Sequence, residues 1–171
     1  RRDEAGRPRS PTWVQVYREL VEWAILFKLV RKKDFGTDTL IIRDGLLRSK
    51  VFAKDLFGRF RAGLREGIER QLRENRRRIY VVGLAKRSKV LTRYRLAMRL
   101  EGVLRNDYPC YVEVPRPLEE KAYVWSEYAR GDDVSIESLS EVNKFVAGKM
   151  FFVKFGSRKG DPVWPVDVFL E

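Results

Sequence analysis

The sequence predicts one α/β domain in which helices flank a mixed β-sheet. Segments whose apolar side chains recur at the 3.6-residue period of a helix alternate with short runs of β-branched and aromatic residues. The 171 residues are 44% hydrophobic and 12% aromatic, which is enough to build one core of ordinary size. We find no internal repeat and no low-complexity tract, so a solenoid or array is not expected.

The N-terminal segment divides into a tail and a first helix. Residues 1–11, RRDEAGRPRSP, have the composition of a solvated linker, so the domain is expected over residues 12–171. The chain begins at Arg1 without a methionine, and we expect it to be a piece of a longer protein. A helix is predicted over about 12–31. Its apolar positions near helical spacing are Trp13, Val16, Tyr17, Leu20, Ala24, Phe27 and either Leu29 or Val30.

The middle of the chain predicts two strands and two helices. A short apolar strand is expected at 39–43, and the next apolar strand at 79–84 within RRRIYVVGLAKRSK. Between them, residues 51–75 carry one i, i+4 apolar row and predict an amphipathic helix. A third helix is expected over about 91–104.

The C-terminal part predicts a strand pair, a further strand and a closing helix. Residues 110–114 and 122–128 are predicted as strands joined by a proline-containing turn at 115–118. Residues 131–138 are expected to form a loop and 148–155 a last strand. The turn 156–162 then leads to a predicted helix that begins near Trp164.

The charge balance favours a polyanionic partner. There are 36 Lys and Arg against 24 Asp and Glu, which gives a formal net charge of +12 and a pI near 10.0. Nucleic acid is the first expectation, although a ribosomal or membrane-surface protein shares this balance. No apolar run reaches the ~18 residues of a membrane span, so no membrane partner is expected. The single cysteine, Cys110, is typical of a reducing compartment and suggests a cytoplasmic location.

The absence of histidine restricts the chemistry. It excludes Ser-His-Asp and Cys-His hydrolases, His-ligated zinc and nucleases with a histidine base. No phosphate-binding loop ending in Gly-Lys-Ser/Thr is present, so the chain is not an NTPase motor by itself. Carboxylates must carry out any catalysis.

The segment LIIRDGLLRSK, residues 40–50, places a carboxylate at the end of an apolar strand. Asp44 stands at the carboxyl end, where open α/β sheets locate their ligand-binding residues, and Gly45 permits a close approach. The alternative is a simple Asp-Gly turn. Glu22, or less surely Glu19, lies on the first predicted helix and could meet Asp44 over the sheet; its alternative is a solvated pair with Arg18.

Two further residues are candidates for the same site. Lys86 follows the second strand and could neutralise a phosphate, or it is a solvated cation in a basic stretch. Asp167 in WPVDVFLE is either a helix cap after Pro165 or a metal ligand. Because Mg²⁺ and Mn²⁺ prefer oxygen ligands, Asp44, Glu22 and Asp167 predict a metal site for phosphodiester cleavage.

Basic stretches predict a nucleic-acid surface. Residues 59–78 contain eight arginines and three glutamates, and residues 86–99 contain six basic residues and no acid, with Tyr94 among them. Such stretches can follow a phosphate backbone and stack a base, or they can be solvated helix faces. The residues predicted to contact nucleic acid are Arg43, Arg48, Lys50, Arg87, Lys89 and Arg93.

One part of the chain resembles the second half of the NurA-type nuclease domain. This part consists of the segment LIIRDGLLRSK, a predicted helix of about 25 residues, and the segment RIYVVGLAKRSKVL. That family has an apolar strand ending in Asp-Gly-Ser-Leu, a helix, and an apolar strand ending in Val-Gly-Ile-Ser-Lys. The resemblance covers roughly residues 13–104, and WPVDVFLE is similar in placement to the family's closing proline-containing segment.

The resemblance implies an RNase H-like fold and a Mn²⁺-dependent 5′ to 3′ exonuclease and endonuclease acting on DNA. It also implies a homodimer and a HerA-type hexameric ATPase as partner in DNA-end processing or in defence against foreign DNA. Asp44 and Glu22 match the family's metal-binding carboxylates, and Lys86 matches its Gly-Ile-Ser-Lys lysine. Leu46 replaces the family's serine, and Asp167 or Glu171 would have to replace its C-terminal histidine.

The family has a further aspartate on its first strand, upstream of the helix that carries the glutamate. This sequence has no counterpart, because the only aspartate before Glu19 and Glu22 is Asp3, in the charged tail. The nuclease fold is therefore expected to be incomplete at its N-terminus. The alternative function is a catalytically inactive nucleic-acid-binding or assembly subunit with the same fold. A third interpretation, half of a Piwi-type slicer, requires guide-strand binding, of which the sequence gives no specific sign.

Overall fold

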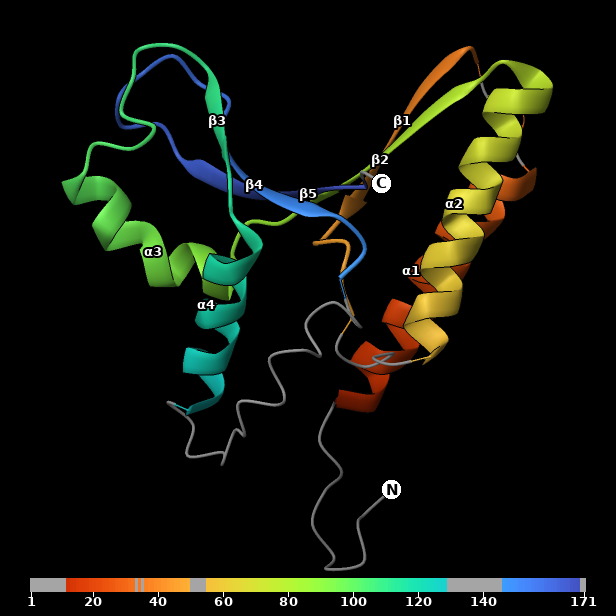
Figure 1. Cartoon of the computed structure of the whole chain (residues 1–171), viewed down its shortest axis with the longest axis horizontal. Coiled ribbons are helices and arrows are strands. Elements are labelled where there is room, and N and C mark those ends of the chain that lie inside the picture. The colour runs from red at the N-terminus through yellow and green to blue at the C-terminus, as the bar shows by residue number, and fades with distance from the viewer. Residues whose placement is uncertain (1–11, 33, 35, 50–54, 129–145, 170–171) are drawn as a thin grey trace, which may run out of the picture. The chain divides into compact units, whose positions relative to one another are not determined.

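The computed structural model describes residues 12–32, 34, 36–49, 55–128 and 146–169. These residues form helices and strands that alternate along the first half of the chain (Figure 1). The elements in chain order are α1 (Thr12–Lys32), β1 (Asp38–Asp44), α2 (Asp55–Asn75), β2 (Arg78–Leu84), α3 (Lys89–Leu100), β3 (Cys110–Glu113), α4 (Arg116–Tyr128), β4 (Lys149–Lys154) and β5 (Val163–Val168).

The strands form one mixed sheet in the order β1-β2-β5-β4-β3. β1 and β2 are parallel. The backbone amide of Arg78 donates to the Thr37 carbonyl at the start of the two strands, and the amide of Gly45 donates to the Leu84 carbonyl at their end. β2–β5, β5–β4 and β4–β3 are antiparallel pairs. The prediction of an α/β fold with a mixed sheet is confirmed.

The chain divides into two compact units, and the division runs through β1 and β2. The first, here called the helical unit, comprises Arg1–Thr39 and Ser49–Ile79. The second, here called the sheet unit, comprises Leu40–Arg48 and Tyr80–Glu171.

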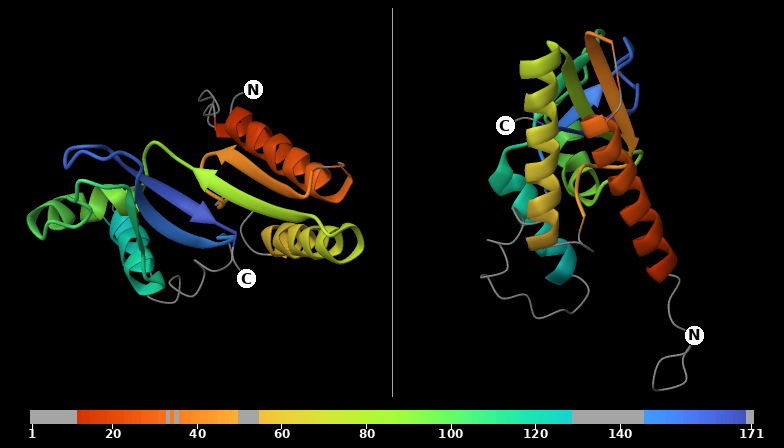
Figure 2. Two further views of the ribbon diagram at one scale, coloured as in Figure 1. Left: turned by 90° about the horizontal axis from the view of Figure 1, so that it is seen from above. Right: turned by 90° about the vertical axis from the view of Figure 1, so that its right-hand side faces the viewer.

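The helical unit is held together by aromatic packing between α1 and α2, which lie side by side (Figures 1 and 2). Trp23 of α1 is buried and meets Phe57 edge to face, with ring centroids 5.2 Å apart. Gly63 of α2 leaves the space that the ring of Phe27 occupies, since a Cβ there would lie 2.3 Å from that ring. α1 and α2 therefore pack through Trp23 and Phe27, whereas most of the apolar row predicted for α1 is exposed: Trp13, Tyr17, Leu20 and Ala24.

In the sheet unit, α3 and α4 lie along one face of β4 and β5 (Figure 2). The strand residues on this face include Met150, Phe152 and Asp167, which are buried. Tyr111 of β3 and Phe151 of β4 lie on the other face, with ring centroids 5.9 Å apart. Four apolar side chains of the sheet unit's strands are more than half exposed: Leu40, Ile42, Tyr80 and Tyr111.

Most predicted elements lie where the sequence placed them, but the segment at 122–128 is a helix and not a strand. α4 begins where a turn was expected, because Pro115 provides the carbonyl to which the backbone amides of Leu118 and Glu119 donate. Proline is favoured in the first helical turn, and Pro117 occupies that turn. Glu119, Ala122 and Tyr123 are buried at i, i+3 and i+4, a helical period that outweighs the β propensity of the aromatic residues.

The predicted C-terminal helix is also wrong, because residues from Val163 to Val168 form strand β5. The segment is rich in valine, which favours an extended backbone. Pro165 is tolerated because the β2–β5 ladder ends beside it, at the Leu84–Val166 pair, and its carbonyl accepts from Ala85. Asp167 is therefore a strand residue and not a helix cap. The predicted loop at 131–138 lies outside the described residues.

None of the helices in the described part of the chain has the length and apolar content needed to cross a bilayer.

Candidate nucleic-acid interface

Two residues predicted for catalysis follow neighbouring strand ends. Asp44 is the last residue of β1 and is exposed, and Lys86 is exposed just beyond β2. Gly45, between Asp44 and the chain's next turn, has a φ of 121°, a conformation that glycine adopts without strain. Because β1 and β2 are parallel, their carboxyl ends lie at the same edge of the sheet.

The second predicted metal ligand, Glu22, forms an ion pair within its own helix. Glu22 belongs to the helical unit and pairs with Arg18 at 3.2 Å, as the structural alternative for that residue proposed. Glu19 is a half-buried residue of the same helix, and Glu171 lies outside the described residues. Over the described ranges, no group of three or more Asp, Glu, Cys or His side chains is arranged to hold a metal ion.

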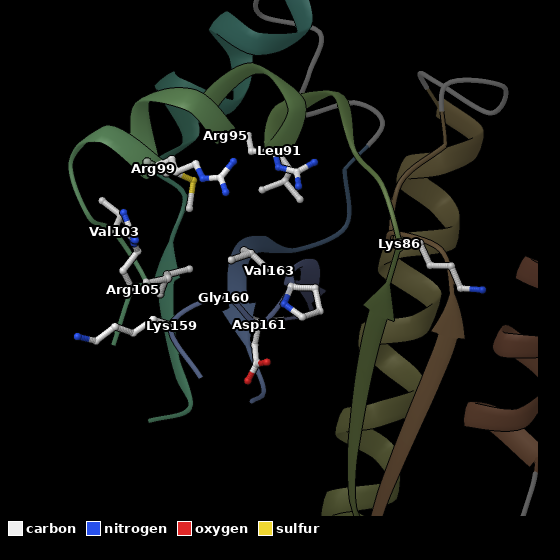
Figure 3. A pocket seen from close by; sticks show the side chains of 13 residues that line it. Lys86, Leu91, Arg95, Arg99, Val103, Arg105, Lys159, Gly160, Asp161 and Val163 are labelled. Carbon is white, nitrogen blue, oxygen red and sulfur yellow. The ribbon is translucent and has the colours of Figure 1, made fainter. Parts of the chain in front are cut away.

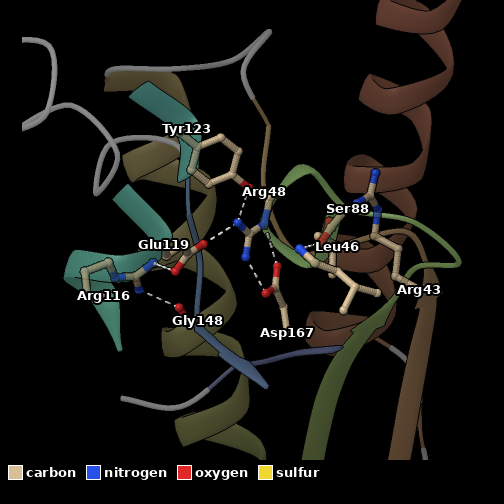
Figure 4. A network of polar contacts seen from close by, with 10 residues as sticks. Arg43, Leu46, Arg48, Ser88, Arg116, Glu119, Tyr123, Gly148 and Asp167 are labelled. Carbon is tan, nitrogen blue, oxygen red and sulfur yellow. Dashed lines mark hydrogen bonds and ion pairs between the residues drawn. The ribbon is translucent and has the colours of Figure 1, made fainter. Parts of the chain in front are cut away.

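Asp167 is fully buried and paired with Arg48 (Figure 4). Its Oδ2 accepts from Arg48 Nε at 2.8 Å, and its Oδ1 accepts from Arg48 Nη2. Gly83 of β2 is its cross-strand partner. A Cβ on Gly83 would lie 2.6 Å from both the Gly45 carbonyl oxygen and the Leu47 nitrogen. The glycine thus lets the chain after β1 cross β2 and bring Arg48 to the buried aspartate.

Arg48 also binds α4. Its Nη1 donates to Glu119 and to the hydroxyl of Tyr123. Arg116 completes this arrangement, with 2.6 Å from its Nη1 to Glu119 Oε2 and 2.7 Å from its Nη2 to the Gly148 carbonyl. Two guanidinium groups therefore face two buried carboxylates, so the network is neutral and joins β5, α4 and the segment after β1.

Burial sets the protonation behaviour of this network. Loss of water raises the pKa of Asp167, and the charge and hydrogen bonds of Arg48 oppose that rise. Burial disfavours the charge of Arg48, but Asp167, Tyr123 and Glu119 outweigh this effect and raise its pKa above the usual range. Burial also raises the pKa of Tyr123. The paired charges favour a structural role for Asp167 and Arg48.

The residues predicted to contact nucleic acid occupy several environments. Arg43 donates to the Leu46 carbonyl, Arg48 belongs to the buried network, and Lys50 lies outside the described residues. Those at the start of α3 are exposed: Arg87, Lys89 and Arg93. Ser88 caps this helix, since its Oγ accepts from the Leu91 amide at 2.9 Å.

A cavity of about 360 Å³ lies between α3, the segment after α3 and the loop that connects β4 to β5 (Figure 3). Its apolar lining comes from α3, from the segment after α3 and from the start of β5. These apolar residues, here called the floor, are Leu91, Met98, Val103, Leu104, Pro162 and Val163.

Cations surround the floor. Arg95 and Arg99 project from α3 on the side of Val163, and Arg105 and Lys159 line the cavity from two loops, with the Lys159 amine turned away from Val163 (Figure 3). All four are exposed, and none has an ionic partner among the described residues. Lys86 also lines the cavity, but its amine points away.

The one carboxylate of the lining, Asp161, serves the local backbone. Its Oδ2 accepts from the Arg158 amide at 2.8 Å, and its own amide donates to the Arg158 carbonyl at 3.1 Å. Figure 3 shows this carboxylate turned away from the guanidinium groups of Arg95 and Arg99. The cavity therefore combines an apolar floor with an excess of positive charge that nothing in the described ranges neutralises.

Sequence reasoning found only part of this cavity. Arg95 and Arg99 belong to the basic stretch 86–99, but Arg105 and Lys159 were not candidates, because a fold is needed to bring them to α3. Tyr94, expected to stack a base, donates instead to the Leu118 carbonyl at 2.7 Å, and burial raises its pKa. The available signal was the absence of any acid between Lys86 and Arg99.

Comparisons with protein-family models, with curated proteins and with solved structures found no match to this chain.

Proposed function

We propose that the chain binds nucleic acid through the basic cavity beside α3. The observation that carries this proposal is the group of four cations without an ionic partner in the described residues: Arg95, Arg99, Arg105 and Lys159. Cations that serve a structural role are normally paired, as Arg48 and Arg116 are in this chain. Unpaired cations around a concave surface instead favour an anion from solution.

A nucleic-acid backbone fits this arrangement better than an isolated small anion. The net charge of +12 and the exposed basic residues at the start of α3 extend positive charge beyond the cavity. Each phosphate that replaces a counterion adds to affinity and to its salt dependence. A polyanion gains from all these cations at once, whereas a single phosphate reaches only one or two.

The test is fluorescence anisotropy with labelled DNA at several salt concentrations. The double substitution Arg95→Ala with Arg99→Ala should weaken DNA binding. It should also make the slope of log affinity against log salt concentration shallower, by the amount expected for the loss of roughly two phosphate contacts. The matched control is Arg59→Ala with Arg73→Ala, which removes two exposed arginines from α2. Equal losses from the two double variants would show that net charge, and not the cavity, determines binding.

A second candidate is a metal-dependent DNA nuclease, favoured by the exposed Asp44 at the shared carboxyl edge of the parallel strands β1 and β2. This candidate includes the NurA-type, RNase H-like assignment, Mn²⁺ or Mg²⁺ as cofactor, a homodimer and a HerA-type hexameric ATPase. In this candidate Asp44 holds the metal and the basic cavity holds DNA. Glu22 and Asp167 are engaged by Arg18 and Arg48, so either must exchange an arginine for the metal.

The nuclease is tested with Asp44→Asn in a longer protein that carries an upstream strand ending in Asp. The substitution should abolish Mn²⁺-stimulated cleavage and leave DNA affinity at low salt nearly unchanged, because it removes a metal ligand and no cation. Residues 1–171 alone should cleave feebly at best, since two-metal displacement needs a further bridging carboxylate. Equal and robust cleavage by both proteins would refute this account of the missing strand.

A further inference from the structure

We infer that the basic cavity holds one unstacked nucleotide of a single strand, with the base against the floor and its phosphate between Arg95 and Arg99. The inference rests on the proposed nucleic-acid binding and adds the form of the ligand. It starts from the composition of the lining, in which six apolar residues lie beside four cations that have no ionic partner in the described part of the chain.

The lining indicates a ligand with one apolar and one anionic part. A site for phosphate alone needs donors but no apolar floor, and a site for an apolar ligand needs no excess positive charge. The volume of about 360 Å³ lies in the range of small-ligand sites, roughly 300–1,000 Å³. A nucleotide has both required parts, and its size suits the cavity.

The two arginines on α3 are placed to bind a phosphate. Arg95 and Arg99 are four residues apart on the helix and therefore share a face. Both project on the side of Val163 of the floor (Figure 3). A guanidinium group binds phosphate through two parallel hydrogen bonds, which a lysine amine cannot do. Arg105 and Lys159, on the loops at the edge of the cavity, then add positive charge for the adjacent phosphates of the strand.

The floor favours a base without selecting its identity. No residue of the lining is aromatic, so the base contacts aliphatic and thioether groups and finds few partners for its edge. We expect weak sequence preference. We also expect single strands to bind better than duplexes, because a paired base must be unstacked before it can enter.

Binding of labelled single strands of about twelve nucleotides tests the inference. A strand with bases should bind at least about fivefold more tightly than an abasic strand of equal length. Thymidine monophosphate should displace the labelled strand at lower concentration than inorganic phosphate does. Val163→Thr should weaken thymidine monophosphate binding about two- to fivefold and leave inorganic phosphate binding unchanged.

The controls separate this inference from the proposed function. If abasic and normal strands bind equally, and phosphate competes as well as the nucleotide, the cavity binds backbone only and the inference is refuted while nucleic-acid binding stands. If Arg95→Ala with Arg99→Ala leaves DNA binding unchanged, the proposed function itself fails. Binding to vesicles of phosphatidylcholine and phosphatidylglycerol that thymidine monophosphate cannot reverse would overturn both in favour of a lipid headgroup.

Discussion

Arg48 and Asp167, which are 119 positions apart in the sequence, form a two-bond ion pair in the interior of the sheet unit. Arg48 follows β1, and Asp167 lies in β5, on the far side of β2. The pair therefore joins the segment after β1 to β5 across Gly83 of β2. Arg48 also holds α4 in place through Glu119 and Tyr123.

Removing Arg48 should strongly destabilise the protein. Arg48→Met leaves the buried carboxylate of Asp167 without its counter-charge, and breaking such a pair costs about 3–5 kcal/mol. The free energy of unfolding, measured with urea and tryptophan fluorescence, should fall by that amount. Arg87→Met, at an exposed site, should change it by less than about 0.5 kcal/mol.

A double variant distinguishes this structural role from metal binding. Arg48→Met with Asp167→Asn removes both charges and should recover part of the stability that Arg48→Met loses. If Asp167 were a metal ligand held in place by Arg48, Asp167→Asn alone would leave stability intact and remove Mn²⁺ binding. Calorimetric titration with Mn²⁺ decides between the two.

Tyr123 should make stability depend on alkaline pH. Burial raises its pKa from 10.0, so the folded state keeps the phenolic proton at pH values where the unfolded state loses it. This contribution to stability is complete below pH 10.0 and is lost as pH rises through the folded pKa. Tyr123→Phe loses a hydrogen bond to Arg48, worth about 1.5–3 kcal/mol near pH 8, but does not ionise.

The stability difference between the native protein and Tyr123→Phe should therefore shrink above pH 10.0. Urea unfolding at about pH 8 and about pH 10.5 measures it. Tyr94→Phe examines the same effect at a second site, because burial also raises the pKa of Tyr94, whose hydroxyl donates to the Leu118 carbonyl. A difference that stays constant with pH would contradict the role assigned to Tyr123.

The sequence predicted elements whose pattern is local and missed those that depend on neighbours. The helical period of α1 and α2 and the apolar run of β2 need no tertiary information, and these three elements were predicted correctly, although much of the apolar row predicted for α1 is exposed. β5 was misjudged because Pro165 resembles a helix start, and only the end of the β2–β5 ladder explains why it is tolerated in a strand.

The candidate site shows the same limit. Asp44 was correctly expected at the end of a strand, but nothing near Asp167 in the sequence points to Arg48 as its partner. Arg105 and Lys159 likewise gain meaning only when the fold brings two loops to α3. Long-range pairing, and not local propensity, decided which charged residues became structural and which remained available to a ligand.

Gly83 should tolerate no side chain. Gly83→Ala places a Cβ 2.6 Å from two backbone atoms of the crossing segment, which cannot rotate away, and should cost at least about 1–3 kcal/mol. Gly58→Ala in α2 meets nothing within 4 Å and should stabilise the protein by about 0.4–1 kcal/mol. Thermal and urea unfolding of the two variants should therefore change in opposite directions, and a neutral Gly83→Ala would refute the close crossing.

Lys154 should control the shape of the cavity, although it does not line it. This lysine is fully buried, and its amine donates to the carbonyls of Asn106 and Arg158, which adjoin the cavity residues Arg105 and Lys159. Lys154→Met keeps the length of the side chain but leaves both carbonyls without this donor, so the two loops lose their common anchor.

The expected result of Lys154→Met is weaker DNA binding, by about three- to tenfold, even though the lost charge is buried and touches no ligand. Stability should fall by about 1–3 kcal/mol, so binding must be measured where urea titration shows the variant to be folded. Lys149→Met is the matched control, because Lys149 lies in the same strand but is exposed and pairs with Glu113 at 3.2 Å. If both variants weaken binding equally, the effect comes from net charge, and the anchoring of Arg105 and Lys159 by Lys154 plays no part in binding.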